Sequence, residues 1–133
     1  MAEKTTVAKL NGLRLAPRKV SLVASLVRGR TVADALVILE HTPKRAAKPL
    51  AKLIASAKSN AVSNHGMQEK DLLITTLSVT AGEKLKRYRP AAHGRALPFV
   101  RASSNVRLVV TGTEKPKKKP AAKPAKSAVK EAK

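Results

Sequence analysis

The chain has 133 residues, of which 28 are lysine or arginine and 8 are aspartate or glutamate, so its formal net charge is +20 and its sequence pI about 11.2. This length accommodates one domain and a tail, and the absence of cysteine excludes a disulfide framework and the usual structural zinc sites. The chain starts without an apolar signal core and has no run near the roughly 20 residues that span a bilayer. These features predict a cytoplasmic protein that does not span a membrane.

The positive charge is spread over the whole chain. Residues 1–80 carry 13 basic and 5 acidic residues, residues 81–113 carry 7 and 1, and residues 114–133 carry 8 and 2. A neutral enzyme with a basic tail would carry its excess in one place only. A positive field of this breadth attracts nucleic acid or an anionic membrane face. A membrane-surface role is disfavoured, because the basic helices predicted below lack the bulky aromatic face that such binding uses.

A short edge strand is predicted over Thr5–Leu10, followed by two helices. The first helix runs from Pro17 to Arg28, because proline suits the first helical position and apolar residues then recur at helical spacing. The second helix opens at Thr31, where Thr31-Val-Ala-Asp34 resembles a capping box with aspartate in the place of glutamate.

A third and longest helix is predicted to begin after Thr42-Pro43, which is typical of a cap followed by proline in the first turn, and to end near Gly66. Pro49 lies inside this segment, so either a bend or a start delayed by a turn is expected. One face of the helix is apolar. The basic residues lie largely on the other face: Lys44, Arg45, Lys48, Lys52 and Lys58.

Two runs rich in β-branched residues, 72–80 and 105–111, predict a pair of antiparallel strands. The link of about twenty residues is too long for a tight turn, so we expect the strands to continue outward as a hairpin whose tip lies about 30 Å beyond the body. Pro90, Gly94 and Pro98 mark the apex. An isolated two-stranded ribbon is only marginally stable in water, so we expect a polyanion to stabilise it. Besides the single acid Glu83, the segment carries six basic residues: Lys84, Lys86, Arg87, Arg89, Arg95 and Arg101.

The expected fold class is α+β, with a small antiparallel three-stranded sheet packed against three helices and the long hairpin protruding. The face toward the helices would carry Leu77, Val79, Val106, Leu108 and Val110. The face toward solvent would carry Thr76, Ser78 and Arg107. We divide the chain into a domain over residues 1–112, with the hairpin at about 72–111, and a basic Lys/Pro/Ala tail over residues 113–133 that is expected to be disordered.

The sequence gives little basis for catalysis. His41, His65 and His93 lie in different predicted elements, and none has a metal-ligand spacing. No enzyme activity, metal or cofactor is therefore expected. Tyr88 and Phe99 flank the apex, where pairing with each other across the hairpin and stacking on bases are both open.

Several segments match one family in order. They are Arg14 to Lys19, Leu26-Val-Arg-Gly-Arg30, Ala55-Ser-Ala-Lys-Ser-Asn-Ala61, Lys86-Arg-Tyr-Arg-Pro-Ala-Ala-His-Gly-Arg-Ala96 and Ser104-Asn-Val-Arg-Leu-Val-Val110. Over about residues 5–112 the chain closely resembles the large-subunit ribosomal protein L twenty-two family of the bacterial type.

This resemblance implies a non-enzymatic ribosomal protein that binds large-subunit ribosomal RNA, assists subunit assembly and reaches its hairpin to the wall of the nascent-peptide exit tunnel. The implied partners are this RNA, neighbouring ribosomal proteins and the nascent peptide, without homo-oligomers. The implied RNA-binding residues are Arg14, Arg18, Lys19, Arg28 and Arg30 in the body and Lys84, Lys86, Arg87, Tyr88, Arg89, Arg95 and Arg101 in the hairpin. The implied tunnel-facing tip is Arg89, Pro90, Ala91, Ala92, His93, Gly94 and Arg95.

Two other classes of function are weighed against this one. A DNA-compacting architectural protein would account for the tail, which resembles that of a linker histone, but not for the hairpin or its apex. A small ribonuclease would use His65 or His93 as its acid or base.

Overall fold

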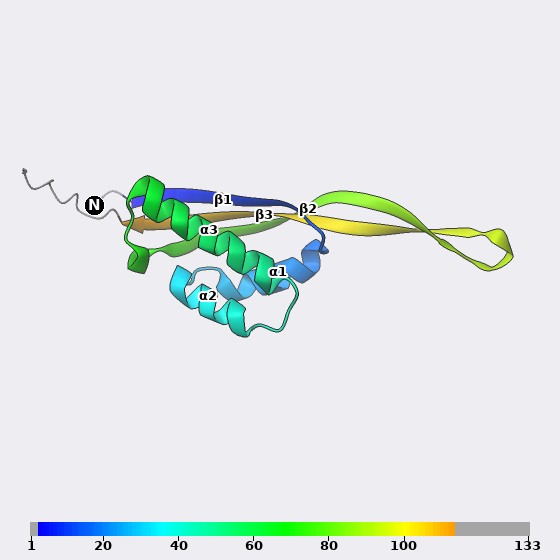
Figure 1. The fold of residues 1–133 in the computed structure, drawn as a ribbon, viewed down its shortest axis with the longest axis horizontal. Coiled ribbons are helices and arrows are strands. Elements are labelled where there is room, and N and C mark those ends of the chain that lie inside the picture. The colour runs from blue at the N-terminus through cyan, green and yellow to red at the C-terminus, as the bar shows by residue number, and fades with distance from the viewer. Residues whose placement is uncertain (1–2, 114–133) are drawn as a thin grey trace, which may run out of the picture.

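The computed structural model describes residues 3–113, which form a three-stranded antiparallel sheet with three helices along one side (Figure 1). The strands are β1 (Glu3–Leu13), β2 (Leu73–Pro90) and β3 (Ala96–Thr113), and β3 lies between the other two. The helices are α1 (Pro17–Val27), α2 (Val32–His41) and α3 (Ala47–His65). The predicted α+β class and the long hairpin are confirmed.

The strands extend further than the sequence predicted. β1 continues beyond the predicted Thr5–Leu10 at both ends, and Thr113, which the prediction gave to the tail, is the last residue of β3. The rest of the tail lies outside the described residues, and the domain boundary at residue 112 stays a prediction.

The first two helices begin where the sequence predicted. α1 starts at Pro17, and the Thr31 hydroxyl caps α2 by accepting a hydrogen bond from the Asp34 N–H at 3.2 Å. The same hydroxyl donates to the Asp34 carboxylate at 2.8 Å, so the aspartate completes the cap through the side chain.

The predicted helix cap at Thr42 was wrong. Thr42 ends α2 instead of opening α3, because its hydroxyl donates back to the Ile38 carbonyl at 2.6 Å. α3 begins only at Ala47, which puts Pro49 in the first helical turn, where a backbone N–H has no intrahelical acceptor. The delayed start, one of the two expected outcomes, therefore accommodates the proline.

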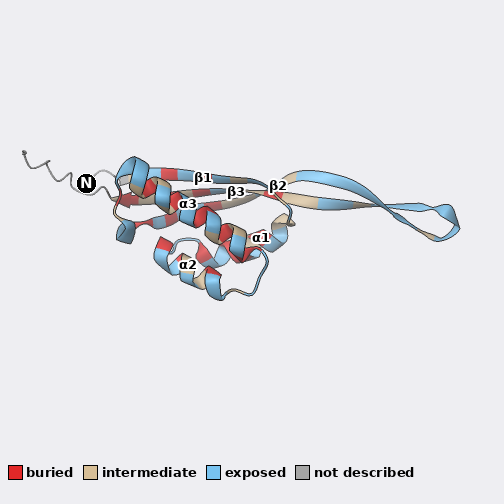
Figure 2. Ribbon diagram, viewed as in Figure 1, coloured by how far each residue is buried: buried red, intermediate tan, exposed pale blue. Residues whose placement is uncertain are grey.

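The hydrophobic core lies between the helices and one face of the sheet (Figure 2). Along β3 the side chains alternate, so that Val106, Leu108 and Val110 are buried under the helices and Arg107 is exposed, as predicted. The largest fully buried side chains are aliphatic or methionine: Leu50, Ile54, Met67, Leu72, Ile74, Leu108, Val20, Val23, Val27, Val32, Val106 and Val110.

A β-bulge corrects the alternation in β2. Ile74 and Leu77 are both buried although they lie three positions apart, because the register shifts by one residue between Ile74 and Thr76. The predicted inward face is therefore confirmed for Leu77, while Val79 is only half-buried.

The connection between α1 and α2 covers the outer edge of β2 where that strand starts. The Gly29 N–H donates to the Ile74 carbonyl at 3.0 Å, and the Ile74 N–H donates to the Arg30 carbonyl at 3.0 Å. Gly29 has φ +70°, a left-handed conformation that glycine adopts without a steric penalty. No signal in the sequence predicted this pairing.

Toward the tip of the hairpin, the sheet narrows from three strands to two at Ser104, because no residue of β3 nearer the tip pairs with β1. At this level β-bulges interrupt both neighbours of β3, between residues 10 and 13 of β1 and between residues 81 and 84 of β2. The Gly12 N–H donates to Asn105 Oδ1 at 2.9 Å, and Ser103 Oγ donates to the Glu83 carbonyl at 2.6 Å. Side chains of β3 thus hold both bulges, and beyond them only β2 and β3 continue.

Leu50→Ala is expected to lower the free energy of unfolding by about 2–5 kcal/mol, because it removes a large side chain from the packed core and leaves a cavity. Leu22→Ala on α1 is the matched control, since Leu22 is 63% exposed, and its expected effect is within about 0.5 kcal/mol. Urea denaturation followed by circular dichroism measures both. Equal losses for the two variants would contradict the core described above.

Candidate nucleic-acid interface

Beyond the bulges, β2 and β3 form a protruding ribbon, which we call the finger: residues 84–90 paired with residues 96–102 and joined by the turn 91–95. Paired strand residues at about 3.3 Å each carry the ribbon roughly 23 Å outward before the turn begins, in line with the predicted protrusion. No helix of the described chain covers the finger, and most of its side chains are exposed (Figure 2). Both of its faces are therefore open to a partner.

The strand register sorts the finger's cations onto two faces, because directly opposed residues lie on the same side of an antiparallel pair and neighbours alternate. The arginine face carries Arg87, Arg89 and Arg101 together with Leu85, Leu97 and Phe99. The lysine face carries Lys84, Lys86 and Tyr88 together with Pro98 and Val100. The finger thus offers guanidinium groups on one side and ammonium groups on the other.

Phe99 organises the arginine face. The guanidinium carbon of Arg89 lies 5.0 Å from the centre of the Phe99 ring and that of Arg101 lies 5.8 Å away, both within the range of cation–π attraction. Tyr88 opposes Pro98 on the lysine face and is 68% exposed. The two aromatic residues therefore do not pair across the hairpin, and the Tyr88 ring stays accessible for stacking.

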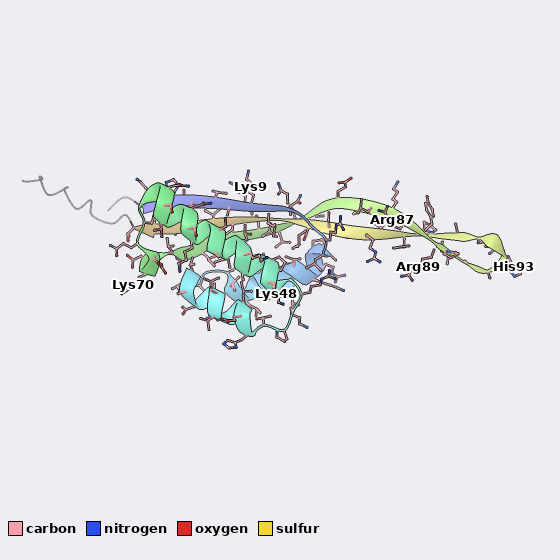
Figure 3. The ribbon with its side chains drawn as sticks, viewed as in Figure 1. Lys9, Lys48, Lys70, Arg87, Arg89 and His93 are labelled. Carbon is pink, nitrogen blue, oxygen red and sulfur yellow. The ribbon has the colours of Figure 1, made fainter. Side chains whose placement is uncertain are left out.

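The tip of the finger is a tight reversal of the backbone. His93 and Gly94 have φ values of 57° and 71°, and the Arg95 N–H donates to the Ala92 carbonyl at 3.4 Å. Two successive residues with positive φ are the pattern of a type I′ turn, whose twist matches that of the strands it joins. This turn places His93 at the far end of the molecule (Figure 3).

At the base of the finger, arginines from four separate segments surround one cleft of about 390 Å³. They are Arg14 after β1, Arg45 before α3, Arg87 in β2 and Arg101 in β3. Within residues 3–113 none of these guanidinium groups forms an ion pair, whereas Lys58 of α3 pairs with Glu69 at 2.5 Å. The cleft therefore concentrates positive charge that the described chain does not neutralise.

A second hollow of about 380 Å³ continues this surface toward α1. Its cations are Arg18, Lys19, Lys44 and Arg45, and Arg45 lines both the hollow and the cleft. Sequence reasoning missed Lys44 and Arg45 as site residues, because it assigned them to the solvent face of the third helix. They lie in the connection before α3, where helical periodicity carries no information.

Arg28 and Arg30 lie apart from the cleft, just after the opposite end of α1. Arg28 Nε donates to the Leu77 carbonyl at 2.8 Å and Arg30 Nε donates to the Leu26 carbonyl at 3.0 Å. Of the body residues implied to bind RNA, the structure thus gathers Arg14, Arg18 and Lys19 near the finger and leaves these two on another surface.

The histidines do not converge. His41 ends α2, His65 ends α3 and His93 lies at the tip. Among residues 3–113 no three His, Cys, Asp or Glu side chains gather into a possible metal site. Every helix in that range is too short or too polar to cross a bilayer.

The described residues form a small basic body with a protruding cationic hairpin, an arrangement typical of architectural proteins that bind a polyanion. The family model described as "Ribosomal protein L22p/L17e" matches residues 8–111, so the chain belongs to this family.

Curated relatives agree with the family. A "Large ribosomal subunit protein uL22" from Mesoplasma florum is 45% identical over 104 residues, which cover 78% of this chain and 93% of that protein. The protein of the same name from Herpetosiphon aurantiacus is 45% identical over 107 residues, covering 80% and 95%. The one from Mycoplasma capricolum is 44% identical over 104 residues, covering 78% and 94%. As a member of a structural ribosomal family, the chain is a non-enzyme located in the ribosome, and hence in the cytoplasm, as the sequence predicted.

Backbone amides of the finger are expected to exchange hydrogen faster than those of the body sheet in the free protein, because an uncovered two-stranded ribbon is only marginally stable in water. Hydrogen–deuterium exchange read by mass spectrometry compares residues 96–103 with residues 104–113, the two halves of β3. The second half is the internal control. Equal protection of both halves would show that the finger is rigid without a partner.

Proposed function

We propose that the chain, a structural constituent of the large ribosomal subunit, binds large-subunit ribosomal RNA through the finger and the cleft at its base. The proposal depends most on the cleft, where Arg14, Arg45, Arg87 and Arg101 converge without an ion-pair partner among the described residues. The relatives named large ribosomal subunit proteins support the ribosomal particle as the place of binding.

Arginine suits this role because its planar guanidinium group forks onto two phosphate oxygens and also stacks on bases. Arg87 and Arg101 belong both to the arginine face and to the cleft. An RNA strand that lies along the finger would therefore stay in contact with guanidinium groups until it reaches the cleft. The exposed Tyr88 ring adds a stacking surface on the other side. The expected mode is recognition of phosphates and shape, not readout of base edges.

We assign the tip, residues 89–95, to the wall of the nascent-peptide exit tunnel. A ribbon two strands wide fits between RNA helices where a globular domain does not, and the type I′ turn gives it a narrow end. By joining RNA segments along its length, the finger also supports subunit assembly beside neighbouring ribosomal proteins. His93 and Arg95 are the polar side chains at this end that a passing peptide would meet.

Binding of the full chain to large-subunit ribosomal RNA at several salt concentrations tests the RNA interaction. Log affinity is expected to decrease linearly with log salt concentration, and the magnitude of that slope is expected to fall by about 0.7–0.9 for each phosphate that a substitution leaves unbound. Replacing Arg87, Arg89 and Arg101 by glutamine therefore reduces the slope by about 2–3. The matched control replaces the same residues by lysine, which keeps the charge and the slope but cannot form the forked hydrogen bonds, so part of the affinity disappears.

Each contrary result points to a different conclusion. An affinity that does not change with salt would remove the electrostatic basis of the proposal. Equal binding to duplex DNA, without co-sedimentation with large subunits, would favour the DNA-compacting alternative. RNA cleavage that disappears in His65→Ala or His93→Ala would favour the ribonuclease.

A photoreactive amino acid at position 93, in ribosomes that hold a stalled nascent chain, tests the tunnel assignment. Crosslinks from position 93 to both RNA and the nascent chain are expected. The same group at position 70, in the short 3-10 helix Glu69–Asp71 of the body, is the control and should not label the nascent chain. Labelling of neither molecule from position 93 would remove the tip from the tunnel wall.

A further inference from the structure

The sheet face opposite the helices carries two cations that the finger and the cleft do not use. Lys9 of β1 lies directly opposite Arg107 of β3, and Ser78 of β2 lies opposite Arg107 on the other side. These three residues form a row across all three strands, which we call the back row. Lys9 and Arg107 are exposed. Lys9 lies on the edge strand β1, where it also lines a hollow of about 510 Å³ with Lys48 and Lys52 of α3.

The back row is electrostatically unfavourable in the free protein, because like charges directly opposite each other destabilise a sheet. The rows on either side offer no acid: Val7, Val109 and Thr76 on one side, Asn105 and Thr80 on the other. Within residues 3–113 neither Lys9 nor Arg107 forms an ion pair. The sheet therefore holds two neighbouring positive charges that no acidic residue of the described chain neutralises.

We propose that the back row is a second RNA-binding surface, which takes the phosphodiester backbone of ribosomal RNA on the side of the molecule away from the helices. The inference rests on the proposed function and adds a place of contact to it. Opposed side chains start only about 5 Å apart at their Cβ atoms, so both cations reach the same short stretch of backbone. The small valine and threonine side chains around them leave that approach open.

Repulsion within the back row links RNA binding to protein stability. A bound phosphate removes the repulsion, whereas loss of one cation removes it without RNA. A substitution at Lys9 is therefore expected to stabilise the free protein and to weaken RNA binding at the same time. A residue with a merely structural role would move stability and binding in the same direction.

Lys9→Glu in the full chain tests the inference, because it places a carboxylate opposite Arg107. The melting temperature of the free protein is expected to rise. Since the carboxylate leaves about two phosphates unbound, the affinity for large-subunit ribosomal RNA at 0.1 M salt falls about thirtyfold and the salt slope falls by about 1.5. The control Lys70→Glu makes the same change in net charge beside Glu69 and Asp71, and its expected effect is within about threefold.

A wild-type salt slope and affinity in Lys9→Glu would overturn the back row and leave the proposed function standing. A wild-type chain without salt-sensitive RNA binding would overturn both.

A second measurement uses Ser78→Cys, which gives the chain its single cysteine, carrying a tethered iron chelate in assembled large subunits. Hydroxyl-radical cleavage of ribosomal RNA is expected from this position. Cleavage of a neighbouring ribosomal protein alone, or of nothing, would overturn the inference.

Discussion

The pairing of β3 is the constraint on which the rest of the molecule depends. From Ser104 to Thr111 this strand lies between both neighbours, and it buries alternate side chains under the helices. From Ala96 to Ser103 it pairs with β2 alone, and none of its side chains is buried. The pairing of β2 with β3, which resumes beyond each bulge, therefore anchors an uncovered ribbon to a hydrophobic core, so the finger needs no core of its own.

Charge explains why such a ribbon belongs in a ribonucleoprotein particle. A net charge of +20 repels itself in the free chain, and the structure increases that repulsion by bringing arginines from four segments around one cleft and by opposing Lys9 with Arg107. Contact with a polyanion adds attractive interactions that offset this repulsion. Because a ligand that binds only the folded state stabilises it, the proposed RNA contacts would strengthen both the finger and the fold that carries it.

Much of the fold followed from local patterns in the sequence, because the helices have clear apolar periodicity and the two β-branched runs bracket the apex. The start of α3 did not follow, since Thr42 uses its hydroxyl on the preceding helix, a choice that tertiary packing decides. The sequence predicted which kinds of residue form the candidate site, but it did not predict how they are arranged in space. Arg45 joins the cleft, and Lys9 meets Arg107, only through contacts between segments distant in sequence.

The two bulges that Ser103 and Asn105 hold have a consequence for the length of the finger. They separate the ribbon from the packed body, so residues inserted in opposed pairs beyond them leave every core contact in place. Each such pair would move the tip by about 3.3 Å. The number of paired residues beyond the bulges therefore sets how far the tip reaches, independently of the contacts that keep the body folded.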